Sequence, residues 1–289
     1  MGKIKVLPDT LISQIAAGEV VERPASVVKE LIENSIDAGA TDCAIELEQG
    51  GIKLISIRDN GCGMSTQDAP AAFLRHATSK ISALDDLHTI ATFGFRGEAL
   101  AAIASVAHVQ LKTREAQADS GFEIEYRGGT CVSHSTIGCP PGTQITVRNL
   151  FFNTPVRKKF LKTETTELTH SIATINQMAL AHRSVGFSLK HNGKTLLKVS
   201  PTSSWPERIA AILGEQTVRE SRPIEFKTPS LTINGFVGSP GMSMRSKRHQ
   251  YLFVNGRPVS DSAVARAVID GYASLLPARS YPLFILDIS

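Results

Sequence analysis

The chain has 289 residues, of which 42% are hydrophobic, and this length favours two domains with apolar cores over a single one. The formal net charge of +4 is only a mild hint of an anionic partner. No segment is apolar for long enough to cross a membrane, and the N-terminus lacks a signal-peptide core, so we expect a soluble, cytoplasmic protein. The four cysteines and eight histidines form no metal-binding pattern, which indicates reduced thiols and no zinc site.

The first well-defined element is a helix that begins at Pro24 and ends at Gly39. Proline suits the first turn of a helix, and glycine suits the left-handed position that follows its last turn. Apolar residues at helical spacing form one face of this helix: Val27, Val28, Leu31, Ile32 and Ile36. Polar residues at positions i, i+3, i+4 and i+7 form the opposite stripe: Glu30, Glu33, Asn34 and Asp37.

This polar stripe has two interpretations. A solvated acidic face is the simpler one. However, no lysine or arginine is interleaved between residues 30 and 37, so like charges repel along the stripe. Asn34 is also a poor helix former and a good oxygen ligand for Mg²⁺. A carboxylate beside such an amide can orient a water molecule and accept its proton, which would make the stripe catalytic.

Helices and strands follow in an order typical of an α/β sandwich. A strand over 52–58 ends in the tight turn from Asp59 to Gly63. Further helices are expected over 67–76, 98–107 and 166–182, and strands over 106–113, 122–126 and 144–148. A hairpin turns at Asn192–Gly193 between strands over 187–189 and 196–199. These elements predict an α+β fold with a mixed sheet that helices cover on one face.

A polar segment, Ser200–Ser204, is the best candidate for a domain boundary, so we expect domains over 1–204 and 205–289. The second domain should contain helices over 205–214 and 262–276 and strands over 231–237, 251–254 and 283–288.

Several short motifs suggest a phosphate site, although the two commonest phosphate cradles, the P-loop and the dinucleotide-binding glycine motif, are absent. Asp59 ends a strand, and a carboxylate there can accept a hydrogen bond from an adenine amino group while glycines such as Gly63 let the backbone approach the ring. The loop from Gly94 to Leu100 leads into a helix whose first N–H groups can bind phosphate. Residues 75–80 add hydroxyls and a lysine, and Thr143 adds a hydroxyl near Asp59.

Together these motifs carry a resemblance to a known family. The chain contains long, collinear matches at residues 14–26 (QIAAGEVVERPAS), 33–40 (ENSIDAGA), 75–80 (RHATSK), 94–100 (GFRGEAL), 151–160 (FFNTPVRKKF) and 254–257 (VNGR). It resembles the GHKL ATPases and, among them, the MutL family of DNA mismatch repair proteins. The resemblance implies a Bergerat-type α/β sandwich with a mixed sheet, followed by an α/β domain like domain 2 of ribosomal protein S5.

The same resemblance implies roles for particular residues. Glu30 would be the general base that activates water, Asn34 would hold Mg²⁺, and Asp59 would recognise the adenine of ATP with support from Thr143. A lid over the phosphates would comprise Thr78, Ser79, Lys80, Gly94, Phe95, Arg96, Gly97, Glu98, Ala99 and Leu100. Residues 1–21, and about 7–21 in particular, would form an arm that dimerises when ATP orders arm and lid.

The family resemblance also implies partners, and this chain differs from the family pattern in one respect. Its members act with a MutS-like mismatch recognition protein and a downstream nuclease or helicase. They use a second-domain lysine from a His-Pro-Ala-Lys-like motif at the γ-phosphate, and that motif would lie just beyond Ser289. We therefore expect a truncated second domain, and we expect ATP binding to survive better than hydrolysis.

Two basic clusters are candidates for contacts with DNA. One contains Arg157, Lys158, Lys159 and Lys162, and the other contains residues 245–249 with Arg257 and Arg266. A solvated surface loop is an equally good interpretation of the residues alone, but the family resemblance favours DNA. Because phosphate contacts release counterions, we expect sequence-independent binding that weakens with salt.

Two alternatives to a slow ATPase switch remain. A histidine kinase shares this pocket, although no phosphoacceptor-histidine helix precedes it. A nucleotide-gated DNA-binding module without turnover would also suit the residues.

Overall fold

A computed structural model describes residues 17–78 and 97–289 of the chain. The chain divides into two compact units. The first contains the described residues up to Ile175 together with Val185–Ser200, and the second contains Asn176–Ser184 and Pro201–Ser289. None of the helices in the described part combines the length and the apolar character needed to span a lipid bilayer.

An eight-stranded sheet forms the first unit, in the order β5-β4-β3-β6-β2-β1-β7-β8. All neighbouring strands are antiparallel except β1 and β7, which are parallel, so the sheet is mixed as predicted. Its strands are β1 (Asp42–Glu48), β2 (Leu54–Asp59), β3 (His108–Arg114), β4 (Gly121–Arg127), β5 (Thr130–Ile137), β6 (Gly142–Arg148), β7 (Gly186–His191) and β8 (Lys194–Val199).

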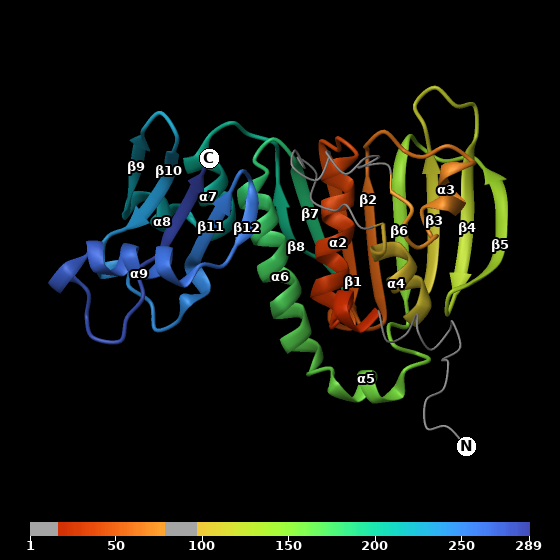
Figure 1. Cartoon of the computed structure of the whole chain (residues 1–289), viewed down its shortest axis with the longest axis horizontal. Coiled ribbons are helices and arrows are strands. Elements are labelled where there is room, and N and C mark those ends of the chain that lie inside the picture. The colour runs from red at the N-terminus through yellow and green to blue at the C-terminus, as the bar shows by residue number, and fades with distance from the viewer. Residues whose placement is uncertain (1–16, 79–96) are drawn as a thin grey trace, which may run out of the picture. The chain divides into compact units, whose positions relative to one another are not determined.

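Helices lie on one face of this sheet. In Figure 1, α2 lies over β1 and β2, and α4 lies over the middle of the sheet. Strand residues alternate accordingly: Val109 and Leu111 of β3 are buried, whereas His108, Gln110 and Lys112 point to the other face. The helices of this part are α2 (Pro24–Asp37), α3 (Asp68–Ala71), α4 (Ala99–Val106), α5 (Pro155–Phe160) and α6 (Glu164–Ala181), whose residues after Ile175 belong to the second unit.

Helix α2 has the predicted ends. Pro24 occupies the first turn. Gly39 has a φ of 72°, and its N–H donates to the carbonyl of Ile36, while the N–H of Ala40 donates to the carbonyl of Ser35. These bonds satisfy carbonyls that the helix end leaves open, and they need a residue that tolerates positive φ.

In the second unit, helices cover both faces of a five-stranded sheet with the order β12-β11-β13-β10-β9. Tyr251, Phe253 and Ile285 pack on one face with α7 and α8, and Leu252 and Phe284 pack on the other with α9. The elements are α7 (Trp205–Leu213), α8 (Glu215–Arg219), β9 (Ser221–Lys227), β10 (Thr232–Gly238), β11 (Gln250–Val254), β12 (Arg257–Val259), α9 (Ser262–Gly271) and β13 (Phe284–Ile288).

Sequence patterns did not predict every strand. The residue pattern did not predict β1, because its exposed positions are acidic and acidic residues are uncommon in strands. β5 was missed because it is exposed along almost its whole length, so it shows no alternation of apolar and polar residues.

Candidate functional site

The carboxylate of Asp59 stands at the C-terminal end of β2, where three donors hold it. Oδ1 accepts hydrogen bonds from the backbone N–H of Gly61 (2.9 Å) and of Thr143 (3.1 Å). Oδ2 accepts a bond from the hydroxyl of Ser35 on α2 (2.8 Å). The side chain is therefore fixed from the turn after β2, from β6 and from α2, which suits a group that must present an acceptor to a ligand.

Burial raises the pKa of Asp59, and the bonds from Gly61, Ser35 and Thr143 partly offset this effect. The carboxylate is thus partly desolvated but well bonded. Such a group makes a stronger hydrogen bond to a ligand donor than an exposed carboxylate does, because less water competes for it.

The turn after Asp59 lies directly against the end of α2. The N–H of Cys62 donates to the carbonyl of Ala38 (2.9 Å). A side chain at Gly142, whose φ is 108°, would come within 2.3 Å of the Asp59 carbonyl, and one at Gly63 would come within 2.1 Å of the Arg114 carbonyl. Glycine is therefore required at both positions for the backbones to approach this closely.

Glu30 and Asn34 lie on α2 at increasing distance from this turn, with Asn34 the nearer of the two. Asn34 is one helical turn and Glu30 two turns before Ala38, which corresponds to about 6 Å and about 12 Å along the helix axis. Both residues are partly exposed, and they share one side of the helix because they are four positions apart. Asp59, which lies against the end of α2, is thus followed by Asn34 and then Glu30 along the helix axis.

The acidic stripe is less repulsive than the sequence suggested. Lys29, just before the stripe, lies 3.1 Å from Glu33 and 3.7 Å from Glu30. Glu33 is only 6% exposed, so it is part of the packed surface of α2 and not of a solvated face. Burial raises the pKa of Glu33, and Lys29 opposes this shift. Lys29 therefore compensates a charge that would otherwise be buried alone.

Thr143 contributes differently from the expectation. Its backbone N–H, and not its hydroxyl, donates to Asp59. The hydroxyl of Thr143 lies 3.1 Å from the hydroxyl of Thr113. The Thr113 hydroxyl also accepts a hydrogen bond from the N–H of Met64 and lies within donating distance of the Gly142 carbonyl. This buried pair fastens the turn to the ends of β3 and β6. The sequence does not mark Thr113 and Ser35 as site residues, because a buried hydroxyl carries no periodic signal.

The predicted lid is only partly within the described residues. Ser79, Lys80, Gly94, Phe95 and Arg96 lie outside them. At the two sides of this segment, Gly97 has a φ of 59°, and a side chain there would come within 2.1 Å of the Ala77 carbonyl. His76 also lies 3.1 Å from Glu98. Thr78 is thus brought close to the start of α4, where Ala99 and Leu100 form the first turn.

The DNA-binding candidates differ in their surroundings. Lys158 and Lys159 of α5 are exposed, whereas Arg157 is half-buried and its guanidinium lies against Gly18. Arg266 of α9 forms a 2.9 Å ion pair with Asp270. The two lysines are therefore the residues in this set best placed to contact a phosphate backbone, while Arg157 packs against the protein.

The donor set fits a magnesium ion only in combination with a phosphate ligand. Among the described residues, no group of three or more His, Cys, Asp and Glu side chains could hold a metal ion. An amide oxygen such as that of Asn34 is a suitable ligand for Mg²⁺, which keeps several waters and commonly binds substrate phosphates. A site of this kind does not need a cage of carboxylates.

Family models match both units. Residues 22–128 match the model described as "Histidine kinase-, DNA gyrase B-, and HSP90-like ATPase", and residues 209–289 match "DNA mismatch repair protein, C-terminal domain". The first unit thus belongs to the GHKL class of ATPase domains.

Curated relatives and solved structures give the family. The chain is 47% identical over 285 residues to the DNA mismatch repair protein MutL of Syntrophotalea carbinolica, covering 98% of this chain and 45% of the relative. It is 46% identical over 288 residues to MutL of an Exiguobacterium species, covering 100% of this chain and 47% of the relative. The chain therefore spans about half the length of the curated relatives it matches.

Among solved structures, the chain is similar to the Aquifex aeolicus MutL ATPase domain complexed with ADP. The identity is 30%, the TM-score is 0.68, and 93% of this chain and 92% of that chain are covered. A structure described as the N-terminal domain of a DNA repair protein has 26% identity and a TM-score of 0.80, with 96% of this chain and 86% of that chain covered. The chain belongs to the MutL family of DNA mismatch repair proteins and carries the ATPase region of that family.

Proposed function

We propose that the first unit binds Mg-ATP along α2 and hydrolyses it slowly, and that the bound nucleotide controls self-association in DNA mismatch repair. The observation that carries this proposal is the position of the Asp59 carboxylate. Three donors hold it beside the C-terminal end of α2, the helix that bears Asn34 and Glu30. The binding of ADP by the similar Aquifex ATPase domain supports a nucleotide as the ligand.

Asp59 would recognise the adenine ring. Its Oδ1 already accepts two backbone bonds, so Oδ2, which accepts one bond from Ser35, has capacity for a further donor. An adenine amino group is such a donor. Guanine presents a carbonyl oxygen at the same ring position, and two acceptors facing each other repel, so the site should prefer ATP to GTP.

The phosphates would lie towards the first turns of α2 and the start of α4. Asn34 would hold the magnesium ion, which when bound neutralises phosphate charge and polarises the γ-phosphoryl group. The first N–H groups of α4, after Gly97 and Glu98, would bind phosphate oxygens at the helix N-terminus. Thr78 lies beside that terminus, and we assign Ser79, Lys80, Gly94, Phe95 and Arg96 to the same lid.

Glu30 would accept the proton of the attacking water. Its side chain is partly exposed, and it stands four residues before Asn34 on the same side of α2. A base in this position acts on water and not on the bound nucleotide, so it contributes to turnover and little to binding.

The mismatch repair role brings partners. We infer sequence-independent binding of DNA, with Lys158 and Lys159 contacting phosphates, ATP-dependent dimerisation through residues 1–21, and contacts with a MutS-like protein and a downstream nuclease or helicase. We further propose that residues 1–204 form the ATPase domain, that residues 205–289 form an S5-like domain, and that the protein acts in the cytoplasm.

The decisive experiment is equilibrium binding of a non-hydrolysable ATP analogue with Mg²⁺, compared between the unmodified chain and its Asp59→Ala variant. We expect binding by the first and a loss of at least about tenfold in the second, because a charge-assisted hydrogen bond and its acceptor are removed. Asp119→Ala is the matched control, since Asp119 is an exposed aspartate elsewhere in the same unit. Equal affinity of the Asp59→Ala variant would rule out the adenine assignment.

A further inference from the structure

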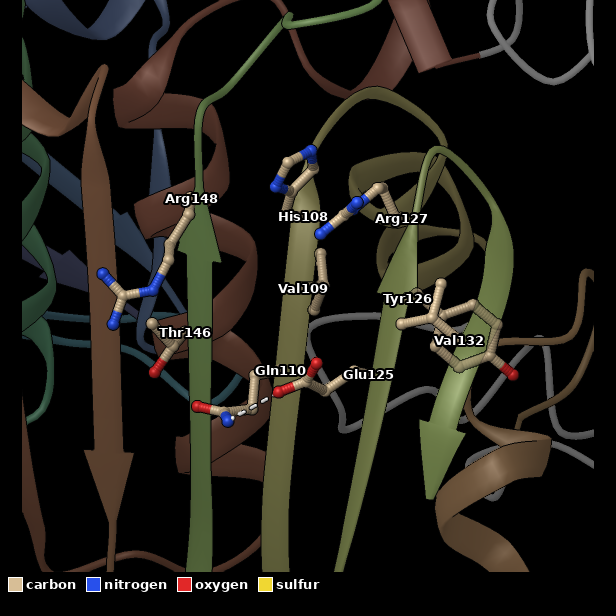
Figure 2. A pocket seen from close by; sticks show the side chains of 9 residues that line it. All are labelled: His108, Val109, Gln110, Glu125, Tyr126, Arg127, Val132, Thr146 and Arg148. Carbon is tan, nitrogen blue, oxygen red and sulfur yellow. Dashed lines mark hydrogen bonds between the residues drawn. The ribbon is translucent and has the colours of Figure 1, made fainter.

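Three basic side chains form a row across the open face of the first unit's sheet, away from the Asp59 site. His108 of β3 is directly opposite Arg127 of β4 on one side and Arg148 of β6 on the other. Residues directly opposite each other in a sheet point to the same face, and here that face is the one that no helix of residues 17–78 and 97–289 covers. In Figure 2 the three side chains rise from adjacent strands, and no described helix lies over them.

A hollow of about 210 Å³ accompanies this row. It is lined by the three basic residues and by Gln110, Glu125 and Thr146 among others. Ligand sites for larger molecules usually measure about 300–1,000 Å³, so this volume suits one small group. Two arginines face a single carboxylate in the lining, and that carboxylate, of Glu125, accepts a 3.0 Å bond from Gln110 (Figure 2). The hollow is therefore positive on balance.

The two arginine side chains have no ion-pair partner in the described part of the protein. Within residues 17–78 and 97–289, the side chains of Arg127 and Arg148 form no hydrogen bond and no ion pair. Of the neighbouring carboxylates, Glu123 pairs with Lys112. Glu48 pairs with Lys53, and its charge interacts with Arg148 without forming an ion pair. The two guanidinium groups therefore keep their planar donor sets available for a ligand.

The surroundings of His108 also favour a bound anion. Its Nε2 atom is buried and has no hydrogen-bond partner among the described residues. The ring of Phe152 packs edge-on against the imidazole, with the two ring centroids 4.4 Å apart, and restricts its movement. Burial and the nearby charge of Arg127 lower the pKa of His108. A buried nitrogen without a partner is costly, and an anion that both accepts its proton and offsets Arg127 would remove that cost.

We propose that Arg127, His108 and Arg148 form a binding site for one oxyanion of the phosphate class on the open face of the sheet. The oxyanion would lie over His108, accept the imidazole N–H, and receive guanidinium donors from one strand on each side. In Figure 2 the Arg148 guanidinium extends towards β2, and its exposed side chain can rotate over His108 when the anion enters. The site is distinct from the ATP pocket and does not depend on the function proposed above.

The test follows the imidazole signals of His108 by NMR as pH is varied, in sodium phosphate and in sodium chloride of the same ionic strength. An anion on the imidazole favours its charged form, so phosphate should raise the pKa of His108. The Arg127→Gln/Arg148→Gln double variant should bind phosphate at least about tenfold more weakly, because two charge-assisted donors are lost. Assignment of His108 comes from its disappearance in His108→Gln.

Lys190→Gln is the matched control. Lys190 is an exposed cation of β7 in the same sheet, it does not line the hollow, and its substitution removes one positive charge. This variant should respond to phosphate like the unmodified protein. No response of His108 to phosphate, or an equal response in the double variant, would overturn the proposal.

Two further ligands identify the source of the phosphate. A response of His108 to a short single-stranded oligonucleotide, lost in the double variant, supports a nucleic-acid backbone as the natural ligand. A response to inorganic phosphate but not to the oligonucleotide supports the site with a small phosphate compound as its ligand. A response to a glutamate-rich peptide but to neither phosphate ligand overturns the proposal in favour of a protein interface.

Discussion

The hydroxyl of Ser35, in the last turn of α2, donates a 2.8 Å hydrogen bond to Oδ2 of Asp59, at the end of β2. This bond connects the helix that carries Glu30 and Asn34 to the carboxylate assigned to adenine. The same hydroxyl lies 3.1 Å from the carbonyl of Leu31. A hydroxyl has one proton, and the shorter contact to the charged acceptor should take it.

Replacing Ser35 should therefore disturb the site more than the helix. Ser35→Ala should weaken binding of the ATP analogue about three- to tenfold and lower the free energy of unfolding by about 1–2 kcal/mol, because one bond to a carboxylate is lost. Ser105→Ala is the matched control, since Ser105 is also buried in a helix and its hydroxyl donates only within that helix, to the carbonyl of Ala102. Fluorescence titration and urea unfolding measure the two effects. Normal affinity in Ser35→Ala would show that the bond does not orient Asp59.

Asp59→Asn should separate stability from binding. Burial raises the pKa of Asp59, so its ionised form destabilises the folded state at neutral pH. This free-energy cost is fully present at a pH above the folded-state pKa of Asp59. It disappears once the pH falls below the pKa of an aspartate in the unfolded chain. The variant should thus melt at a higher temperature than the unmodified protein at pH 7, with the difference shrinking in acid.

The same variant should lose nucleotide affinity by more than about tenfold, because an amide N–H₂ can face the adenine amino group where the acceptor stood. Asp119→Asn should change neither quantity. Thermal melts at several pH values and analogue titrations give the answer, and a lower melting temperature at pH 7 would contradict the assigned cost of the buried charge.

Glu30→Gln tests the general base. Turnover should fall by about 10²–10⁴-fold, while affinity for the ATP analogue should stay within about threefold, because the base acts on the attacking water. Glu46→Gln is the control, since Glu46 is an exposed residue of β1. Single-turnover hydrolysis of labelled ATP is the measurement, and normal turnover in Glu30→Gln would assign the base elsewhere.

Lys29 should stabilise α2 through Glu33. Lys29→Met keeps the apolar stem but leaves the buried Glu33 carboxylate without its 3.1 Å partner. Because the lysine is half exposed and screened by solvent, we expect a loss of about 1 kcal/mol at pH 7. The pKa of Glu33 is already raised by burial, so protonation in acid should remove most of this loss.

A double-mutant cycle isolates this pair. The Lys29→Met/Glu33→Gln variant should recover most of the stability lost in Lys29→Met, since no buried charge remains. Urea unfolding of the four proteins measures the coupling. Additive effects of the two substitutions would mean that the pair contributes nothing to the fold.

Basic residues of α5 should differ in their effect on DNA binding. Lys158→Ala and Lys159→Ala should each reduce the slope of log affinity against log salt concentration by about 1, because each removes one phosphate contact. Lys194→Ala and Lys198→Ala, in exposed positions of β8, are controls with the same charge change. Equal slopes in all four variants would exclude α5 from the DNA interface.

How much of the fold was predictable depended on periodicity and on turn residues. Pro24, Gly39 and the Asn192–Gly193 turn gave correct helix and hairpin positions, because each fixes the local backbone by its own stereochemistry. The alternation in β4 and β6 gave their strands. β5 could not be predicted, because an exposed edge strand is held by pairing with β4 and shows no apolar pattern of its own.

The sequence by itself determined the family, the order of the elements and the identity of Glu30, Asn34 and Asp59 as candidates, because these depend on residue type and spacing along one chain. Only the tertiary structure decided which groups hold them. The bonds of Asp59 to Ser35 and Thr143 join residues 24 and 84 positions apart. The row of Arg127, His108 and Arg148 exists only because three strands align in register. Contacts of this kind depend on strand pairing and burial, which no local pattern records.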